Sequence, residues 1–193
     1  MEHRWIQAAT ILPPTLKVCG RRLLPFCLRH RVALEAIGSP IINTHLLVGA
    51  EDVLAAVRIL SSYDLEDFRK PSTFMEGLWM SRMRRDKKKL LEEASKLHYY
   101  FEAQSLWPRF WQKDDGDKDH ATPWPLVVVS ALMRNGCTYE EAWTMPEAEA
   151  VWLHVAHAQA AGAKIDVVSD KEWDAMQKHE REEAEKQKTK PKD

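Results

Sequence analysis

Apolar residues recur every three or four positions along much of this chain, which is the spacing of a helix with one buried face. The first clear pattern is PFCLRHRVALEAIG, residues 25–38. Its proline suits the first helical position, and Gly38 suits the left-handed residue just after a helix. A second helix is predicted at 51–62, where two acidic residues in the first turn favour the helix dipole. Between the two, 41–48 is compatible with a short strand or an extended connection.

The longest helical pattern covers about 74–104 and follows a break at 70–73. Apolar residues at intervals of three and four form one face, which Lys87 interrupts. The residues on this face are Met83, Leu90, Ala94, Leu97 and Phe101. A helix of this length needs a packing partner along much of that face.

Two further helices are predicted in the C-terminal half, after the polar and acidic linker 113–123. Residues 123–136 (PWPLVVVSALMRNG) favour a helix, although their run of three valines would also suit a strand. A short helical turn at 139–143 precedes the next helix. That helix is predicted to start near Thr144, whose T-x-x-E spacing to Glu147 matches a capping box.

The chain is therefore predicted to be mainly α. Residues 1–168 are expected to form a single helical domain of about five to six helices, which the acidic linker near 113–122 could divide into two subdomains. A last helix from about Ser169 runs into a charged, helical or partly disordered tail over 169–193.

Composition favours a soluble protein that stays in the reducing cytosol of the cell that makes it. Of the 193 residues, 45% are hydrophobic and 30% charged, and the net charge of −1 argues against a domain devoted to nucleic acid. The three cysteines are odd in number and contain no C-x-x-C pair, so neither a disulfide framework nor a zinc ribbon is indicated. No signal peptide is indicated, and no apolar run approaches the roughly 18 residues of a membrane span.

Two histidines three positions apart, His154 and His157, are the first candidate for chemistry. Two helical residues at this spacing can share a metal ion, but zinc needs a third and usually a fourth ligand. The nearby Cys137, Glu140 and Glu141 have no recognised ligand spacing. We therefore interpret both histidines as surface or packing residues and expect no metal site. A small metal-dependent enzyme remains the less favoured alternative.

The linker contains three aspartates at the spacing of positions 1, 3 and 5 of a calcium-binding loop: Asp115, Asp117 and Asp119. The sixth position should be glycine and is His120, and the twelfth should be glutamate and is Leu126. Both requirements fail, so we interpret the segment as a solvated acidic linker.

The run RMRRDKKK (82–89) is the one concentrated basic cluster. Such clusters can bind phosphate backbones, but no aromatic residue interleaves with this run to stack on bases. A solvated helix surface is the favoured interpretation, and a helical nucleic-acid-binding protein is kept as an alternative. The sequence contains no nucleophile elbow, phosphate loop or dinucleotide fingerprint, so we expect neither an enzyme nor a cofactor.

Tryptophans are concentrated in the middle and C-terminal half of the chain. In a helical domain we expect such side chains to lie mostly in the core, and large aromatic residues also serve as anchors for a partner protein. Together with the long helix, they could line a groove for an amphipathic helix. The predicted partner-binding residues are Trp107, Trp111, Trp124, Trp143, Trp152, Leu90, Leu97 and Phe101.

Three stretches resemble tail assembly chaperones of tailed phages and prophages. They are RRLLPFCLRHRVALEAIGSP (21–40), EDVLAAVRILSSYDLEDF (51–68) and PWPLVVVSALMRNGCTYEEAWTMPEAEAVWLHVAHAQAAG (123–162). The resemblance implies a non-enzymatic helical protein that binds the tape-measure protein, tail-tube subunits or both before the tail polymerises. Such a protein would cover exposed apolar helix faces and leave later. Self-association through the helix at 74–104 is also expected.

Overall fold

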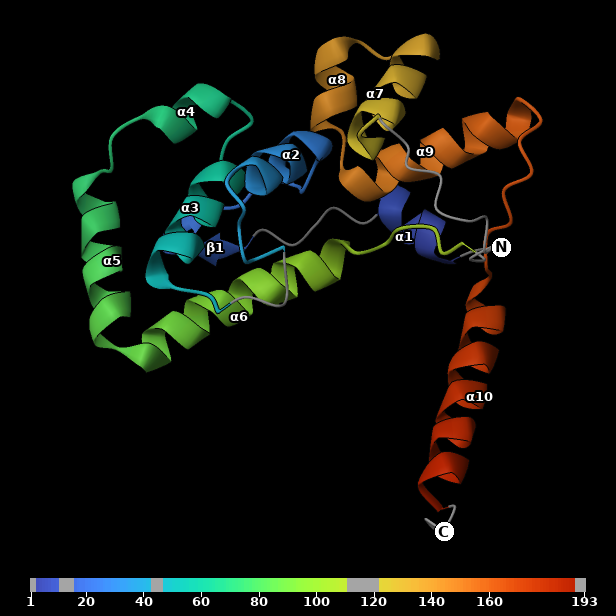
Figure 1. The fold of residues 1–193 in the computed structure, drawn as a ribbon. Coiled ribbons are helices and arrows are strands. Elements are labelled where there is room, and N and C mark those ends of the chain that lie inside the picture. Colours follow the sequence, from blue (N-terminus) through green and yellow to red (C-terminus); the bar gives the residue numbers. More distant parts are fainter. Residues whose placement is uncertain (1–2, 11–15, 43–46, 111–121, 190–193) are drawn as a thin grey trace.

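The computed structural model describes residues 3–10, 16–42, 47–110 and 122–189, and these fold mainly as α-helices (Figure 1). The helices are α1 (His3–Thr10), α2 (Leu28–Ala36), α3 (Ala50–Leu60), α4 (Leu65–Arg69), α5 (Phe74–Arg85), α6 (Lys87–Gln104), α7 (Trp124–Arg134), α8 (Tyr139–Thr144), α9 (Glu147–Ala160) and α10 (Asp170–Thr189). The mainly helical class is confirmed. The helices outnumber the five or six expected, because a helix breaks at Asp86 and several short helices have their own caps.

Four of the helices follow the sequence pattern closely. α3, α7 and α8 lie where helices were predicted, and the valines of α7 are helical, which rejects the strand alternative. α2 begins at Leu28, after the N-cap Cys27, so Pro25 lies before the helix and not at its first position as predicted. Gly38 follows the helix with a left-handed φ of 60°, as predicted. Of the segment 41–48, residues 41–42 form a turn and 47–48 have no regular structure, while 43–46 lie outside the described residues.

The predicted long helix is two helices. α5 and α6 meet at Asp86, whose backbone is extended, and they form a corner in Figure 1. The Asp86 carboxylate accepts hydrogen bonds from the backbone N–H groups of Lys88 (2.9 Å) and Lys89 (3.4 Å), so it caps the new helix. The prediction of one helix was wrong because apolar spacing continued through a residue that acts as an N-cap.

A short hairpin precedes α2 and was not predicted. β1 (Lys17–Val18) pairs antiparallel with β2 (Arg21–Arg22) through a tight turn. Both turn residues have a left-handed backbone, Cys19 with a φ of 47° and Gly20 with a φ of 77°. Strands of two residues are too short to leave an alternating pattern in the sequence.

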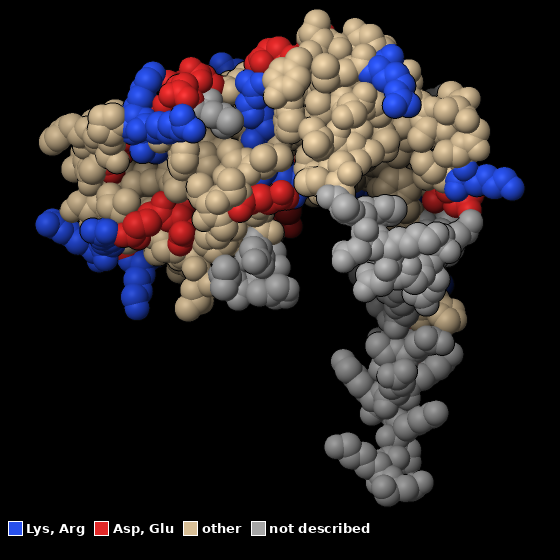
Figure 2. Space-filling model, turned by 45° about the horizontal axis from the view of Figure 1, so that its top comes forward, with Lys and Arg blue, Asp and Glu red and all other residues tan. Residues whose placement is uncertain are grey.

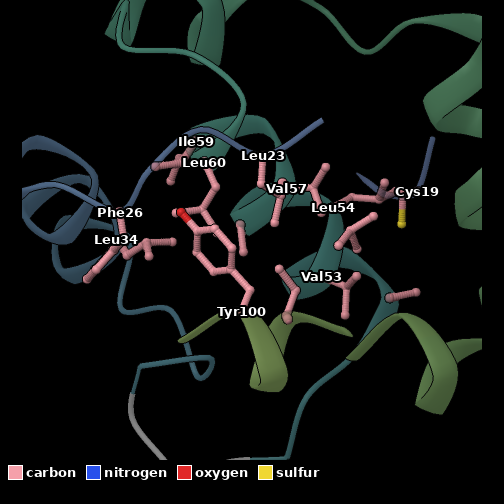
Figure 3. Packing of buried hydrophobic residues seen from close by; sticks show 14 of the residues in the cluster. Cys19, Leu23, Phe26, Leu34, Val53, Leu54, Val57, Ile59, Leu60 and Tyr100 are labelled. Carbon is pink, nitrogen blue, oxygen red and sulfur yellow. The ribbon is translucent and has the colours of Figure 1, made fainter. Parts of the chain in front are cut away.

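The larger core forms around α3, with α2, the hairpin, α5 and α6 packed against it (Figure 3). Its buried residues include Val53, Val57 and Leu60 of α3, and Leu97 and Tyr100 of α6. The Tyr100 hydroxyl donates a hydrogen bond to the Leu24 carbonyl at 2.5 Å, so the buried phenol has a polar partner.

A second, smaller core lies between α7, α8 and α9. Its buried residues are Leu28, Val128, Val129, Leu132, Ala142 and Ala150. α2 contributes to both cores, since Leu28 packs in the second and Leu34 in the first. The Glu147 N–H also donates to the Phe26 carbonyl at 2.8 Å. The two halves of the chain are therefore joined through α2.

α10 extends away from the rest of the molecule in Figure 1. Its start is held by the Val168 N–H, which donates to the Arg109 carbonyl at 2.7 Å, and by the Arg109 guanidinium, 4.3 Å from the Trp173 ring centroid. Ser169 and Glu172 form a capping box at its N-terminus. None of the described helices is both long and apolar enough to cross a membrane.

His30 makes the stability of the fold sensitive to acid. The side chain is fully buried, its Nε2 lies 3.1 Å from the Ser62 carbonyl, and its Nδ1 has no hydrogen-bond partner. Burial lowers its pKa to about 4. The unfolded chain therefore binds a proton that the folded chain excludes between about pH 6.5 and 4, and stability falls as pH falls through this window.

We expect the free energy of unfolding to decrease by about 2 kcal/mol from pH 7 to pH 5 because of His30. Urea unfolding at the two pH values measures this. The decrease should shrink in His30→Leu and persist in His98→Gln, since His98 is exposed and pairs with Glu102. An unchanged pH dependence in His30→Leu would assign the effect to other groups.

Candidate partner-binding groove

An apolar groove of about 560 Å³ lies between α7 and α9, beside the segment that follows α6. Its lining residues are Trp107, Phe110, Thr122, Trp124, Val127, Val128, Val151, His154, Val155 and Ile165. Among these described residues only His154 is titratable, and the others are aromatic or aliphatic apart from Thr122. The volume lies within the range of pockets that bind small ligands or a few side chains of a partner.

Two of the predicted tryptophans stand next to each other in this groove. The rings of Trp107 and Trp124 meet edge to face, with centroids 5.0 Å apart and an interplanar angle of 66°. Trp124 is the first residue of α7 and follows the N-cap Pro123, whereas Trp107 comes from the segment after α6. The fold thus brings together two aromatic side chains that the acidic linker separates in the sequence.

A buried ion pair supports this aromatic wall. The Arg31 guanidinium binds both carboxylate oxygens of Glu147, through Nε to one and through Nη2 to the other at 3.0 Å. Trp107 Nε1 donates to the same carboxylate at 3.1 Å. The guanidinium also lies over the rings of Trp107 (5.1 Å) and Trp124 (5.4 Å), where cation–π attraction adds to the ion pair.

Glu147 therefore does not cap α9 as predicted. The N-cap is Pro146, and Thr144 instead donates its hydroxyl hydrogen to the Glu140 carbonyl at 2.8 Å. The T-x-x-E capping box that does form is Thr138 with Glu141, at the start of α8. The prediction was wrong because burial beside an arginine from a distant helix gives the Glu147 carboxylate better partners than the helix end.

The electrostatics of the pair follow from its burial. Burial raises the pKa of Glu147, and the Arg31 guanidinium and the Trp107 N–H oppose this rise. Burial is the largest single influence on Arg31 and disfavours its charge, but the hydrogen bonds and negative charges of Glu147 and Glu35 together outweigh it and raise the pKa of Arg31. Arginine stays protonated in either case, so the pairing matters most for Glu147, whose buried carboxylate has Arg31 as its cationic partner.

His154 lies in the groove, and His157 lines an adjacent hollow between α7 and α9. Burial, and then the neighbouring His157, lower the pKa of His154, so its imidazole is neutral at pH 7. Its Nδ1 is buried and has no hydrogen-bond partner. Among the residues that the structure describes, no group of three or more His, Cys, Asp or Glu side chains could hold a metal ion. The aspartates of the apparent calcium loop lie outside the described residues.

The two other predicted tryptophans that the structure describes, Trp143 and Trp152, do not line the groove. Trp143 packs against the second core, and its buried Nε1 has no hydrogen-bond partner. Trp152 is half-buried and donates its Nε1 hydrogen to the Leu106 carbonyl at 2.8 Å. Trp111 lies outside the described residues. The structure thus brings Trp107 and Trp124 together and separates Trp143 and Trp152 from them, and the role of these residues in binding a partner stays a prediction.

The predicted residues of α6 pack against the larger core. Leu97 is fully buried there, and Leu90 and Phe101 are partly buried against it. Leu97 and Phe101 also line a second hollow of about 850 Å³, together with Ile41, Ile42 and other residues. Their role in binding a partner stays a prediction, and in this conformation Leu97 contacts the chain's own core.

Sequence reasoning missed the aliphatic side of the groove. Val151 and Val155 of α9 line this side although both are largely buried, and nothing in the sequence showed that they would border a groove. A comparison with family models, curated proteins and solved structures finds no match to this chain.

Proposed function

We propose that this protein is a non-enzymatic tail assembly chaperone-like protein of a tailed phage or prophage. It would bind the tape-measure protein, tail-tube subunits or both in the cytoplasm of the bacterial host during tail morphogenesis. The observation that carries the proposal is the groove between α7 and α9, which is lined by aromatic and aliphatic side chains. The resemblance in three sequence stretches supports the choice of partner.

The groove suits an apolar helix face better than a reactive substrate. Two adjacent tryptophans offer rigid, wide contact surfaces for the leucine- or valine-like side chains of an amphipathic helix. The one titratable lining residue, His154, is neutral at pH 7 and adds no charge that an apolar segment would have to desolvate. A groove of about 560 Å³ holds only a few side chains, so binding would be weak enough to reverse.

Co-expression with the tape-measure protein of the same genome tests this function. We expect the two proteins to elute together in size-exclusion chromatography, and the tape-measure chain to remain soluble where it aggregates alone. Separate elution, with aggregation unchanged, would contradict the proposal.

A pair of neighbouring substitutions on α7 tests the groove itself. Val127 lines the groove and is 42% exposed, whereas Leu126 is 46% exposed and is not among the lining residues. We expect Val127→Asp to weaken binding of the tape-measure protein by roughly tenfold or more, because a carboxylate would then have to be desolvated in the groove. Leu126→Asp should bind like the wild type.

Binding can be measured by titrating purified variants onto immobilised tape-measure protein. Thermal unfolding of both variants controls for stability, since both exchange a surface aliphatic residue for aspartate. If both variants lost the same amount of affinity for the tape-measure protein, the partner would not use the groove.

A further inference from the structure

A second surface, distant in sequence from the groove, is formed by the outer side of α5. Phe74, Leu78, Arg82 and Arg85 follow one another at helical spacing along this side. The opposite side of α5 is buried, with Glu76 and Met83 in the interior. The exposed side is therefore apolar near the start of α5 and basic near its end.

The apolar half of this surface is well exposed. Phe74 is 86% exposed, and Met75 and Leu78 are also exposed beside it. Single exposed apolar residues are common, but three within five positions at one end of a helix form a continuous patch. An exposed phenylalanine is the kind of side chain that a partner protein buries as an anchor.

The basic half continues round the corner into α6. In the described part of the chain, Arg85, Lys87 and Lys88 have no carboxylate partner within ion-pair distance, and Arg82 lies over the Trp79 ring at 5.7 Å. The other two cations of the run are paired, Arg84 with Glu51 and Lys89 with Glu92 and Glu93. Figure 2 shows Lys and Arg side chains gathered at this end of the molecule.

The positions of the lysines are unfavourable for the isolated helix. Lys87, Lys88 and Lys89 occupy the first turn of α6, which contains no acidic residue, and positive charge there opposes the helix dipole. Asp86 compensates in part as the N-cap. A local arrangement that costs stability is expected where a surface binds a partner, because the partner's charges remove the cost.

We infer that the outer side of α5 and the start of α6 dock an acidic amphipathic segment of another protein. The docking surface, here called the α5 corner patch, consists of Phe74, Met75, Leu78, Arg82, Arg85, Lys87 and Lys88. Apolar side chains of the partner contact the phenylalanine end, and its carboxylates contact the four cations. This surface and its ligand go beyond the proposed function, which uses the groove between α7 and α9.

The order of residues along α5 selects this partner over two others. A nucleic acid would leave Phe74, Met75 and Leu78 without a role, because phosphate backbones attract only the cations. A helix that lies on a lipid surface carries its basic residues on both flanks of the apolar side. Here the apolar and basic residues share one side of α5 and follow one another along its axis. This order fits an elongated partner whose apolar and acidic residues are also separated along its length.

A labelled helical peptide tests the inference. It carries leucines in one half and glutamates in the other, and its binding to the full-length protein is measured by fluorescence anisotropy. We expect Phe74→Ser with Leu78→Ser, and separately Arg85→Glu with Lys88→Glu, to raise the Kd by roughly tenfold or more. Salt should weaken binding of the wild type, as it does for ion pairs at a surface.

Matched controls separate the patch from general surface effects. Tyr139→Ser removes another exposed large apolar residue, and Lys164→Glu with Lys171→Glu reverses two exposed charges elsewhere. These variants, and Val127→Asp in the groove, should bind the peptide like the wild type. If Val127→Asp alone lost affinity for the peptide, the peptide would bind in the groove, and the inference would be overturned.

Four other results would also overturn the inference. An all-glutamate peptide without leucines, or a single-stranded oligonucleotide, could bind as tightly as the segregated peptide, which would reduce the patch to a charged surface. Vesicles of anionic lipid could bind more tightly and compete with the peptide. Concentration-dependent dimerisation that Phe74→Ser abolishes, without peptide binding, would show that a second copy covers the patch.

Discussion

Replacing Arg31 by methionine is expected to lower the free energy of unfolding by about 3 kcal/mol, one of the largest effects of any single substitution in this chain. The change removes the cation from a buried carboxylate and leaves Glu147 with one remaining side-chain donor, Trp107. A buried charge without its partner is penalised far more than the intact pair contributes. For a chain of this length the midpoint of thermal unfolding should fall by roughly 6 to 12 °C.

The pH dependence of this variant distinguishes lost charge pairing from lost packing. Without Arg31, burial should raise the pKa of Glu147 further, so the folded chain takes up a proton before the unfolded chain does. The stability gap between Arg31→Met and the wild type should therefore narrow as pH falls from 7 to 5. A gap that stays constant would mean that only the contacts of Arg31 with Phe26, Trp107 and Trp124 matter.

A second ion pair provides the matched control. Arg29 binds Glu140 through two nitrogens, at 2.8 and 2.7 Å, but the Glu140 side chain is largely exposed. Glu140→Gln should lower the free energy of unfolding by less than about 1 kcal/mol, since water can solvate the groups left behind. Equal effects of the two substitutions would contradict the role we assign to burial at Glu147.

Replacing Leu97 by alanine is expected to lower the free energy of unfolding by about 3 kcal/mol, since the side chain is fully buried in the larger core. The loss combines the transfer of apolar surface with the cavity left among α3 and α6 residues, and urea unfolding measures it. The fluorescence of the groove tryptophans in the folded state should not change, because Leu97 is not among the groove residues.

Leu91 on the same helix is the matched control for this substitution. It is 66% exposed, so Leu91→Ala should change the free energy of unfolding by less than about 0.5 kcal/mol. The comparison also tests the sequence-based view of Leu97 as a partner-binding residue. A Leu97→Ala variant with full stability and reduced binding of the tape-measure protein would restore that view.

Local sequence signals predicted most of the helices but not where the long one breaks. α3, α7 and α8 combine apolar spacing with recognisable ends, and Gly38 marks the end of α2, although its start was predicted three residues too early. Asp86 was an equally local signal, and it was overlooked because the apolar spacing continues from Met83 to Leu90 on either side of it. The hairpin at Lys17–Arg22 was too short to show a period.

The candidate groove was predicted only in part, because its residues come from three separate segments. Tryptophan content indicated aromatic contact surfaces, and two of the five tryptophans named do lie side by side. The sequence could not show that Trp143 would pack in a core or that Trp152 would bond to the Leu106 carbonyl. Those outcomes depend on how α7 and α9 pack, which no spacing within one helix encodes.

By itself, the sequence determined the mainly helical class and most helix positions, since these follow from periodicity and capping between neighbours. Only the tertiary structure decided that Glu147 pairs with Arg31 instead of capping α9, and that Trp107 and Trp124 form one wall. It also decided which apolar sides stay uncovered, in the groove and at Phe74. Burial and contact between distant residues are properties of the packed chain, so they become visible only when the helices are placed together.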